Sequence, residues 1–514
     1  MELRRVLEDV ALVRLLGDPA VGVRGIAYDS RTVEPGYLFA ALKGQKEDGN
    51  DFVEQAAARG AVAVLSVRSG DRRPAQLSWA QVEDDRLALA LASRNYYGRP
   101  DERMTMVGVT GTNGKTTVCF LLEAILREAG MKPCLLGTVL HRYGRDEIRA
   151  DRTTPESLDL HRLLDRFATA GARTCAMEVS SHSLVLKRVA GIGFKAAVFT
   201  NLTQDHLDFH GTMEAYLEAK AILFRGLAPD AIAVLNADDP HADRLRALTR
   251  ARVVTFGEKG PADVLLSGFR TSPRGSRITL RIAAGLEGPG STGGSLSLET
   301  QLLGRPNARN LAAASAAAMS LGAPREAIAR AAGTVRGVPG RFERVDAGET
   351  FAVLVDYAHT DDALKNLLEA VRELGPRRIL TVFGCGGDRD RTKRPKMGFA
   401  AAAGSDVVVV TSDNPRGESP MAIIEEILPG VRHALTGDPR REPEPGRVVV
   451  IPDRKEAIRT ALSMARKEDC VVIAGKGHES YQILGDRRVP FDDREVTREL
   501  LRARAAEHRG RAAR

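Results

Sequence analysis

Short apolar runs alternate with longer amphipathic segments along most of the chain. Between residues 101 and 338, the runs "MVGVT", "TCAMEVSS", "AAVFTNL" and "AIAVLNAD" are short and rich in apolar residues, as buried strands are. The segment "KTTVCFLLEAILREAG", which follows the first run, repeats its apolar residues at helical spacing. Because most of these strands are separated by helical segments, the pattern predicts a largely parallel α/β sheet.

The same alternation continues after "GVPGRFE". The runs "FAVLVDYA", "RILTVFG", "DVVVVTS", "RVVVIP" and "CVVIAG" are separated by helical segments such as "DALKNLLEAVREL". This pattern predicts a doubly wound α/β domain, whose ligand site lies beyond the carboxyl ends of its strands. Residues 1–100 carry further short runs, such as "GAVAVLSV", between helical stretches. We therefore expect three domains, at 1–100, 101–338 and 339–514.

Composition narrows the class of protein. The 514 residues are 43% hydrophobic and 28% charged, and no apolar run approaches the roughly 20 residues of a membrane span. The N-terminal segment mixes charge with leucine, which is not typical of a secretory signal. Five scattered cysteines favour a reducing cytoplasm over a disulfide framework. Half of the net charge of +8 lies in the arginine-rich last fifteen residues, so the charge does not point to nucleic acid and is compatible with polyanionic small substrates.

The segment "MVGVTGTNGKTT" resembles a phosphate-binding loop with altered spacing. Gly114-Lys115-Thr116 is present, but Val109 stands where the first glycine of the usual pattern belongs. The loop joins a predicted strand to a predicted helix, and unpaired N–H groups at a helix start favour an anion. Lys115 could reach terminal phosphate oxygens, and the Thr116 hydroxyl could ligate Mg²⁺. The alternative is a glycine turn without a ligand.

Polar side chains follow the next strands of the same predicted domain. "CAMEVSSHS" places Glu178 at a strand end, and "VFTNLTQDHLDFHG" places His206 in the following polar loop. A carboxylate and an imidazole near a phosphate loop could hold a metal that bridges to phosphates. Helix capping and loop hydrogen bonding are the alternatives. A zinc hydrolase is also conceivable, but no H-E-x-x-H motif is present.

Four polar segments follow strands of the third predicted domain. They are "DYAHT", "GCGGDRDRTKRP", "TSDNPRGESP" and "AGKGHESY". Guanidinium groups pair with carboxylates and acids pair with an ammonium, so these segments suit a zwitterionic ligand. Ordinary surface ion pairing is the alternative for any one of them.

Together these motifs resemble the Mur ligases of bacterial peptidoglycan synthesis. The resemblance rests on "GVTGTNGKTT", "EVSSHSL", "FTNLTQDHLDFHG", "NADD", "DYAHT" and "GCGGDRD", and it extends in order from "DSRTVEPGYLFAAL" to "GKGHESYQ". It implies a UDP-substrate-binding domain, a central P-loop ATPase with a mostly parallel sheet, and a C-terminal Rossmann-like doubly wound domain that brings the amino acid. It also identifies the longer loop as this family's phosphate loop.

The resemblance implies an ATP-dependent acid–amino-acid ligase. ATP and Mg²⁺ would phosphorylate the D-glutamyl γ-carboxylate of UDP-N-acetylmuramoyl-L-alanyl-D-glutamate, and the amine of meso-diaminopimelate would attack the acyl phosphate. Arginine in "DNPR" favours diaminopimelate over L-lysine as the incoming amino acid. A lysine-adding ligase and a folylpolyglutamate synthetase remain alternatives, as do a P-loop kinase and a non-catalytic nucleotide-binding protein. We expect a cytoplasmic monomer without nucleic-acid or membrane partners.

The resemblance also carries roles to individual positions. The catalytic residues implied are Lys115, His206 and Lys220, and the metal would be held by Thr116, Glu178, His206 and a carbamylated Lys220. The implied ATP contacts are Gly111, Thr112, Asn113, Gly114, Lys115, Thr116, Thr117, Asn307 or Asn310, Arg341, Asp356 and His359. The implied contacts to the UDP substrate are Ser30, Gln45, Lys46, Glu47, Thr153, Thr154, Ser180 and Arg188. The implied diaminopimelate contacts are Arg389, Asp413, Asn414, Pro415, Arg416, Gly475 and Glu479.

Overall fold

The computed structural model describes residues 1–44, 47–71, 73–286, 288, 290–346 and 348–512. Contacts within the chain form two compact units. The first contains Met1–Gly111, Leu126–Thr200 and Glu214–Thr255, and the second contains Thr112–Ile125, Asn201–Met213 and Phe256–Arg514. Strands and helices alternate in both units, as the sequence pattern predicts. The domain bounds 1–100, 101–338 and 339–514 stay a prediction.

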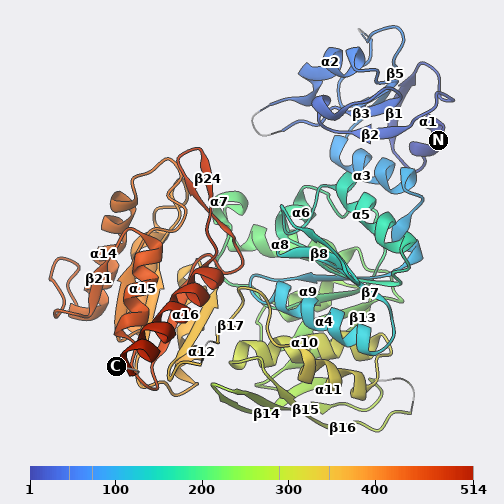
Figure 1. Cartoon of the computed structure of the whole chain (residues 1–514). Helices are drawn as coiled ribbons and strands as arrows, with labels where there is room; N and C mark the ends of the chain where they lie inside the picture. The colour runs from blue at the N-terminus through green and yellow to red at the C-terminus, as the bar shows by residue number, and fades with distance from the viewer. Residues whose placement is uncertain (45–46, 72, 287, 289, 347, 513–514) are drawn as a thin grey trace. The chain divides into compact units, whose positions relative to one another are not determined.

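The first unit begins with a five-stranded sheet (Figure 1). Its strand order is β1-β5-β4-β3-β2, and every pair is parallel except β1 with β5. Apolar residues of α1 and α3 cover one face, and those of α2 cover the other. The elements are β1 (Leu12–Leu16), β2 (Gly25–Ala27), β3 (Tyr37–Ala40), β4 (Ala63–Ser66), β5 (Ser78–Val82), α1 (Leu3–Val6), α2 (Val53–Ala58) and α3 (Asp85–Tyr96).

The remainder of the first unit contains most of a mainly parallel sheet. Its strand order is β13-β12-β11-β6-β10-β7-β8-β9, and β8 and β9 are antiparallel additions. The strands are β6 (Thr105–Thr110), β7 (Pro133–Leu136), β8 (Leu140–Tyr143), β9 (Asp146–Arg149), β10 (Thr174–Glu178), β11 (Phe194–Phe199), β12 (Ile232–Asn236) and β13 (Arg252–Gly257). The helices of this part are α5 (Ser157–Thr169), α6 (Ser181–Val185), α8 (Met213–Arg225) and α9 (Ala242–Leu248). Two helices that intervene in the sequence, α4 (Lys115–Glu128) and α7 (Leu207–His210), lie mostly or wholly in segments of the second unit.

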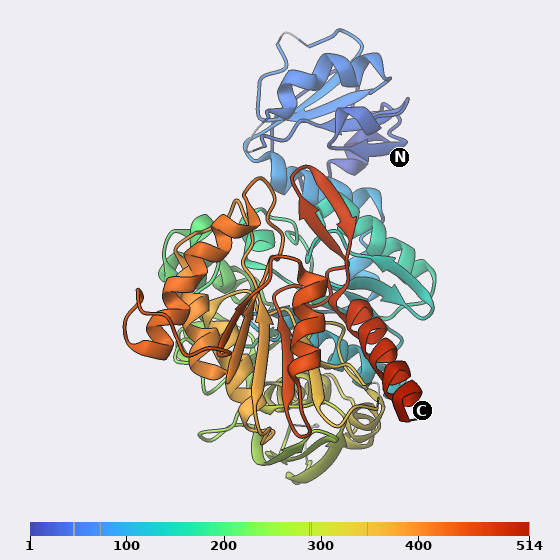
Figure 2. The same ribbon diagram turned by 60° about the vertical axis from the view of Figure 1, so that its left-hand side comes forward.

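The second unit ends in a doubly wound domain (Figure 2). Its sheet has the order β17-β18-β22-β19-β20-β21, in which only β17 is antiparallel. Apolar residues of α12, α13 and α14 pack on one face, and those of α15 and α16 pack on the other. The strands are β17 (Glu343–Arg344), β18 (Ala352–Asp356), β19 (Ile379–Phe383), β20 (Val407–Val410), β21 (Val448–Val450) and β22 (Cys470–Ala474). The helices are α12 (Asp361–Arg372), α13 (Lys393–Gly404), α14 (Pro420–Thr436), α15 (Arg454–Met464) and α16 (Asp493–Ala512).

Two smaller parts complete the second unit. An antiparallel set of strands, β14 (Val264–Ser272), β15 (Gly275–Ile282) and β16 (Gly294–Thr300), precedes the helices α10 (Arg305–Ser320) and α11 (Arg325–Thr334). A hairpin of β23 (Tyr481–Leu484) and β24 (Arg487–Pro490) follows β22. No helix in the described part of the chain combines the length and the apolar character needed to cross a membrane.

Helix α12 illustrates how local sequence specifies these elements. The Thr360 hydroxyl accepts a hydrogen bond from the Ala363 N–H at 3.2 Å and so caps the first turn. Leu364, Leu367, Leu368 and Val371 recur at helical spacing, and all four are buried against the sheet. The capping residue therefore sets where the helix begins, and the apolar stripe sets which face it buries.

A buried histidine makes the first unit sensitive to acid. His161 of α5 has no exposed surface, and neither ring nitrogen has a hydrogen-bond partner among the described residues. Helix α5 packs against α3 and against the short helix Pro100–Arg103, and Arg94 of α3 pairs with Asp101 of that short helix at 2.9 Å. Burial lowers the pKa of His161 to about 4, although Asp101 opposes that shift.

We expect stability to fall with pH because of His161. The unfolded chain takes up this proton near pH 6.5 but the folded chain only near pH 4, so the contribution of neutral His161 is complete above pH 6.5 and is lost as the pH falls towards 4. Linkage gives a loss of about 2 kcal/mol at pH 5. The melting temperature of His161→Leu should therefore decrease less than that of wild type between pH 7.5 and pH 5. The exposed residue His433, changed to Leu, is the control, and an unchanged pH slope in His161→Leu contradicts the prediction.

Candidate active site

The phosphate loop turns between β6 and α4 through two glycines with positive φ. Gly111 has φ +143° and Gly114 has φ +89°, which side-chain-bearing residues rarely adopt. A Cβ on Gly114 would lie 2.5 Å from Oδ1 of Asn310, so the loop also needs glycine here for close approach to α10. Lys115 begins α4, and its Nζ donates to the Thr112 carbonyl at 2.8 Å. The turn therefore places backbone N–H groups and a lysine at a helix start, as anion binding requires.

The polar loop after β11 holds the phosphate loop in shape. The Thr112 N–H donates to the Asn201 carbonyl at 2.8 Å, and the Asn113 N–H donates to Oδ1 of Asn201 at 2.9 Å. The Asn201 amide donates in return to the Asn113 carbonyl at 3.1 Å. Thr203 adds a third connection, because its N–H donates to the Thr112 hydroxyl at 3.0 Å. The conformation of the loop thus depends on a segment about 90 residues further along the chain.

Glu178 lies buried at the last position of β10, as the sequence pattern predicts. Its Oε1 accepts from the Thr138 N–H at 2.7 Å and its Oε2 from the Thr138 hydroxyl at 3.0 Å. A Cβ on Gly137 would lie 2.6 Å from Oε1, so a side chain at that position would displace the carboxylate. Two donors fix the carboxylate in place, and this offsets part of the cost of burying its charge.

Four predicted contacts to the UDP substrate lie together beside Glu178. The Thr154 hydroxyl donates to the Glu178 carbonyl at 2.8 Å and accepts from the Ser180 N–H at 3.3 Å. Nη1 of Arg188 donates to the Thr154 carbonyl at 3.2 Å, and the Thr153 hydroxyl bonds that of Thr138 at 3.1 Å. Ser180 also caps α6 through its hydroxyl. The structure therefore brings Thr153, Thr154, Ser180 and Arg188 into one cluster at the end of β10.

Two of the other predicted UDP contacts, Ser30 and Glu47, lie in the N-terminal sheet region. Ser30 is buried, and its hydroxyl donates to Oε1 of Gln55 at 2.7 Å. Glu47 is exposed. Gln45 and Lys46 lie outside the described residues. Their predicted roles stay predictions.

Lys220 of α8 is a lysine with only 1% of its surface exposed. Its Nζ donates to the carbonyl of Gly111 in the phosphate loop at 3.0 Å and lies 4.2 Å from the centroid of the Tyr216 ring. An ammonium is rarely buried without a functional or paired environment. This position beside the phosphate loop is compatible with the expected carbamylation, which would turn the cation into an oxygen ligand.

Asp205, His206, His359 and Lys115 belong to the same unit and influence one another. Burial alone would raise the pKa of Asp205, but the charges of His206, His359 and Lys115 together hold the pKa below its usual value. Burial lowers the pKa of His359, with Asp205 opposing. His206 has φ +55°, and its N–H donates to Asp205 at 2.9 Å. The polar loop after β11 thus carries an ionised carboxylate between basic groups.

The remaining predicted ATP contacts lie on α10 and around β18. Nη2 of Arg341 donates to the Thr116 hydroxyl at 3.3 Å, and the Arg341 guanidinium lies 4.6 Å from the centroid of the Tyr357 ring. Asp356 accepts from the Phe342 and Ala358 N–H groups, and burial raises its pKa. The alternatives Asn307 and Asn310 both lie on α10. Asn307 is buried, with 5% of its surface exposed, whereas Asn310 is partly exposed. Thr117 is buried in the first turn of α4.

The predicted amino-acid contacts converge at the carboxyl ends of β19, β20 and β22. The Asn414 amide donates to Glu479 at 2.9 Å, and Asp413 lies 3.4 Å from the point where a Cβ on Gly475 would lie. Nη1 of Arg416 donates to the Gly387 carbonyl at 2.7 Å, which fixes the arginine to the loop after β19. Arg416 has φ +53°, a conformation uncommon for arginine. Pro415, between these residues, is buried.

Arg389 is placed differently from the rest of that set. It lies in the loop after β19 and is exposed, and within the described residues it makes no hydrogen bond or ion pair. The loop itself is tied to the "DNPR" segment, because the Gly387 N–H donates to the Asn414 carbonyl at 2.9 Å. Arg389 is therefore near the cluster but available to a ligand.

The donor groups fit Mg²⁺ only with help from a phosphate ligand. The described residues contain no group of three or more His, Cys, Asp or Glu side chains that could hold a metal ion. Of the expected metal ligands, Glu178 and Lys220 belong to the first unit, and Thr116 and His206 belong to the second. The Glu178 carboxylate and the Thr116 hydroxyl are hard oxygen donors of the kind that Mg²⁺ prefers. Mg²⁺ is usually bound through one or two carboxylates and substrate phosphates, so this donor set is compatible with a nucleotide-bound ion.

Comparison with known proteins identifies the family. The description "Mur ligase middle domain" matches residues 109–318, "Mur ligase, glutamate ligase domain" matches 340–477, and "Mur ligase family, catalytic domain" matches 22–97. A UDP-N-acetylmuramoyl-L-alanyl-D-glutamate–2,6-diaminopimelate ligase from Solibacter usitatus is 47% identical over 508 residues, 98% of this chain and 98% of the relative. The enzyme of that name from Syntrophomonas wolfei is 46% identical over 94% of this chain and 95% of the relative.

The chain belongs to the Mur ligase family. A solved structure of a ligase with that same name superposes with a TM-score of 0.68 and 32% identity, over 98% of this chain and 99% of the other. The MurF ligase from Thermotoga maritima in complex with ADP has a TM-score of 0.63 and 21% identity, over 94% and 99%, and so shows a shared fold. The predicted fold class, with a central ATPase and a C-terminal Rossmann-like domain, is confirmed.

Several residues of this Mur ligase that contact the predicted site were missed in the sequence. Lys476 has no exposed surface and contacts both Asn414 and Glu479. Thr138 holds Glu178, and the Tyr357 ring lies 4.6 Å from that of His359 and 5.1 Å from that of His478. Lys476 and Tyr357 lie inside quoted motifs, "AGKGHESY" and "DYAHT", so their place was signalled but not their partners. Nothing in the segment around Thr138 signalled its role.

This Mur ligase also has a groove of about 1010 Å³, lined by the C-terminal domain and by Gln204 of the polar loop after β11. It is lined mainly by α12, α13 and α14, including Lys365, Leu368, Phe399 and His433. None of the predicted site residues lines it. The strand-end clusters, rather than this groove, carry the chemistry that the family resemblance implies.

The geometry of the phosphate loop leads to a prediction for Gly114→Ala. The new Cβ would strain the left-handed backbone by about 1–2 kcal/mol and displace the Asn310 side chain. We expect roughly tenfold weaker ATP binding, measured by titration calorimetry. Gly130→Ala is the matched control, because Gly130 also has positive φ (+74°) but no atom within 4 Å of its Cβ position. Equal ATP affinity in the two variants would count against the assignment of this loop.

Proposed function

We propose that this Mur ligase joins meso-2,6-diaminopimelate to the D-glutamyl γ-carboxylate of UDP-N-acetylmuramoyl-L-alanyl-D-glutamate, with conversion of ATP to ADP and phosphate. Near-full-length relatives at 44–47% identity carry that activity in their names. The observation that carries the choice of amino acid is the cluster at the ends of β20 and β22. Arg416 there offers a guanidinium, and Asp413 and Glu479 offer carboxylates, which together complement a zwitterion with a distal carboxylate.

The residues of the chain have separable tasks in this proposal. The carboxylate of the UDP substrate is a poor electrophile until ATP converts it to an acyl phosphate, which supplies a leaving group. Lys115 and the N–H groups of the phosphate loop are placed to stabilise charge on the transferring phosphoryl group. Mg²⁺, which neutralises phosphate charge when bound, would be held by Thr116, Glu178, His206 and carbamylated Lys220. Arg341 and Asp356 would contact the nucleotide.

The muramoyl dipeptide would be held by the cluster beside Glu178. Arg188 provides a cation there, although burial lowers its pKa and Glu156, 3.3 Å from its Nε, opposes that shift. Thr153, Thr154 and Ser180 provide hydroxyl and backbone groups in fixed orientations. Ser30 and residues 45–47 of the N-terminal domain would bind the uridine end.

The rest of the proposal concerns the setting of the enzyme. We assign residues 1–100 to UDP-substrate binding, 101–338 to the ATPase and 339–514 to amino-acid binding. We also assign the enzyme to peptidoglycan synthesis in the cytoplasm. We expect it to act as a monomer, without nucleic-acid or membrane partners. The lysine-adding ligase is the principal alternative. Folylpolyglutamate synthase from Mycobacterium tuberculosis shares the fold at 20% identity, but covers only 76% of this chain.

The product of the purified protein tests the proposed function. With ATP, Mg²⁺, the UDP-dipeptide and meso-diaminopimelate, we expect one tripeptide nucleotide, one ADP and one phosphate per turnover, measured by mass spectrometry and phosphate release. The same assay with L-lysine in place of diaminopimelate tests the lysine-adding ligase, which would form the tripeptide nucleotide from L-lysine. A phosphorylated product released without an amino acid would indicate a kinase instead.

The proposed pocket predicts a specific defect in Arg416→Ala. A desolvated charged pair is worth roughly 2–5 kcal/mol on truncation, so the Michaelis constant for diaminopimelate should rise at least tenfold. Those for ATP and for the UDP-dipeptide should stay within twofold, in steady-state assays. Arg391→Ala is the control, because Arg391 lies in the same region but forms an exposed ion pair with Glu426. A diaminopimelate constant within twofold of wild type in Arg416→Ala would reject the pocket.

The proposed metal site predicts that Lys220→Ala binds ATP but turns over poorly. Loss of a metal-site group typically costs 10–100-fold in activity. Acetate or formate at high concentration should restore part of the rate by supplying oxygen ligands, as judged from phosphate release. Lys195→Ala, which removes an exposed lysine paired with Asp230, should keep wild-type rates. A wild-type turnover rate in Lys220→Ala would show that a carbamate on Lys220 has no role in the mechanism.

A further inference from the structure

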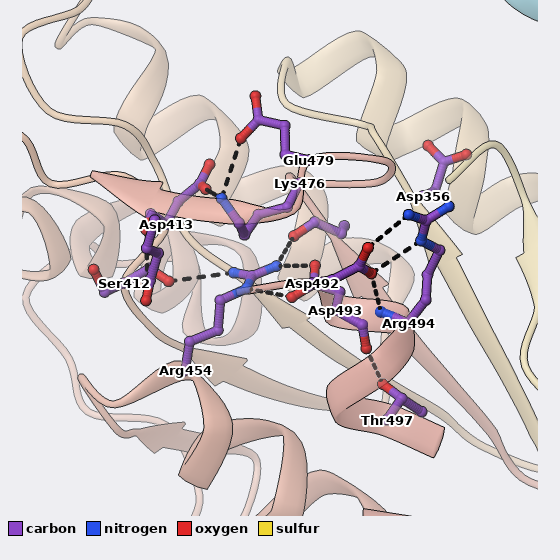
Figure 3. Close-up of polar contacts among 12 residues, drawn as sticks. Asp356, Ser412, Asp413, Arg454, Lys476, Glu479, Asp492, Asp493, Arg494 and Thr497 are labelled. Atoms are coloured by element: carbon purple, nitrogen blue, oxygen red, sulfur yellow. Dashed lines mark hydrogen bonds and ion pairs between the residues drawn. The ribbon is translucent and has the colours of Figure 1, made fainter. Parts of the chain in front are cut away.

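Lys476 is a buried cation at the carboxyl end of β22. It has no exposed surface, and its Nζ lies 3.1 Å from Oε2 of Glu479 and 3.6 Å from Oδ1 of Asp413 (Figure 3). The same Nζ lies 3.2 Å from Oδ1 of Asn414. Burial of an ammonium is costly unless it is paired and hydrogen-bonded. The side chain therefore occupies this place because of its partners and not because it fills space.

The partners of Lys476 belong to two segments that are not adjacent in the sheet. Asp413 and Asn414 follow β20, while Glu479 follows β22, and β19 lies between those two strands. Beyond the strand ends the two backbones meet at one place, where the Arg416 N–H donates to the Ile483 carbonyl at 3.0 Å and the Gly485 N–H donates to the Arg416 carbonyl at 2.8 Å. Side-chain contacts make the connection among Asp413, Asn414 and Glu479. Lys476 spans this distance by contacting both sides at once.

The contacts of Lys476 determine how the Asn414 side chain is oriented. Its Oδ1 accepts from Lys476 and from the Ile483 N–H at 3.1 Å. With both donors on Oδ1, the Nδ2 group faces Glu479 and donates to Oε2 at 2.9 Å. An amide in the flipped orientation would bring NH₂ against two donors, which is unfavourable. Lys476 thereby fixes the orientation of the amide and of the carboxylate together.

The charge of Lys476 also balances the pocket. Asp413 and Glu479 place two carboxylates around one ammonium, and Oδ1 of Asp413 has no hydrogen-bond partner among the described residues. Arg454 also interacts electrostatically with both carboxylates. Without Lys476, the two like charges would keep only that second cation and would separate or recruit water. Either change would move the groups that face the incoming amino acid.

A second buried cation nearby has a different pattern of contacts. Arg454 of α15 pairs with Asp493 at 2.7 Å and donates to the carbonyl of Ser412 (Figure 3). It also donates to the carbonyl of Ala474 at 3.0 Å. Those carbonyls end the backbone runs that lead into the two segments. Arg454 thus fastens backbone, whereas Lys476 contacts the side chains themselves.

We propose that Lys476 is a positioning residue for the amino-acid pocket: it holds the Asn414 amide and the Glu479 carboxylate in the orientation that receives the amino acid. It acts through these two side chains and does not itself contact the substrate. The inference rests on the proposed function, because it assumes that this pocket binds the amino acid.

The test is steady-state kinetics of Lys476→Met, which keeps the length of the side chain but removes its charge. The Michaelis constant for diaminopimelate should rise at least tenfold, while kcat stays within threefold and the constants for ATP and the UDP-dipeptide stay within twofold. Lys476→Gln, which keeps a donor without the charge, should fall between Met and wild type. If circular dichroism shows that Lys476→Met does not fold, Lys476→Gln is tested by the same criteria. In that case the Michaelis constant for diaminopimelate should rise at least threefold.

The matched control is Arg378→Met. Arg378 precedes β19 and pairs at 2.6 Å with Asp469, which precedes β22, so the pair joins the starts of two neighbouring strands, at the opposite end of β22 from Lys476. Loss of this ion pair should lower the melting temperature and leave the Michaelis constant for diaminopimelate within twofold. An equal rise of that constant in Arg378→Met would show that Lys476 acts only through general stability, and would overturn the proposal.

A double-mutant cycle with Glu479→Gln separates positioning from an independent effect. If Lys476 acts through Glu479, Lys476→Met should change kcat/KM for diaminopimelate at least threefold less in the Glu479→Gln background than in wild type. If the two substitutions lower kcat/KM by independent factors that multiply in the double variant, the proposal is overturned. If the wild-type enzyme forms the tripeptide and Lys476→Met has unchanged kinetics, the inference alone is rejected. If the wild-type enzyme forms no tripeptide, the proposed function is rejected.

Discussion

The structure depends on one constraint: strands buried on both faces can present polar side chains only at their ends. All residues of β10, β19, β20 and β22 are buried. Parallel strands place all their carboxyl ends on one edge, and the chain must turn there into a helix or a loop. Glu178, Asp413 and Gly475 lie at or just beyond these ends, so the chemistry gathers where the fold allows polar groups.

Burial at these edges makes each polar group dependent on a partner. Glu178 is held by Thr138, Lys220 by the Gly111 carbonyl, and Lys476 by Asn414 and Glu479. Breaking a buried pair by removing one partner typically costs 3–5 kcal/mol, because the remaining charge stays unpaired. The same contacts therefore serve both stability and orientation, which is why the kinetic split between substrates is needed to separate the two.

The loops at these edges also use uncommon backbone conformations. Gly111 and Gly114 have positive φ in the phosphate loop, where the absence of a Cβ permits it. His206 and Arg416 have φ +55° and +53° although both carry side chains. Arg416 is held there by hydrogen bonds with Ile483 and Gly485 of the following hairpin region. Such strain persists only where surrounding structure maintains it, and it gathers at functional sites.

Local sequence determined a large part of this protein. The apolar periodicity predicted the alternating strands and helices, and the glycine spacing with Lys115 and Thr116 predicted a phosphate loop at a strand–helix turn. These features depend on neighbours within a few residues, so they can be read from the chain directly. The order of strands β22, β19 and β20 and the partners of Lys476 were decided only by the tertiary structure. Lys476 and Asn414 are 62 residues apart, and a lysine in "AGKGHESY" looks like any solvated lysine until packing removes water from it. Burial and proximity across a sheet arise from the packing of the whole domain, and for this reason no local pattern encodes them.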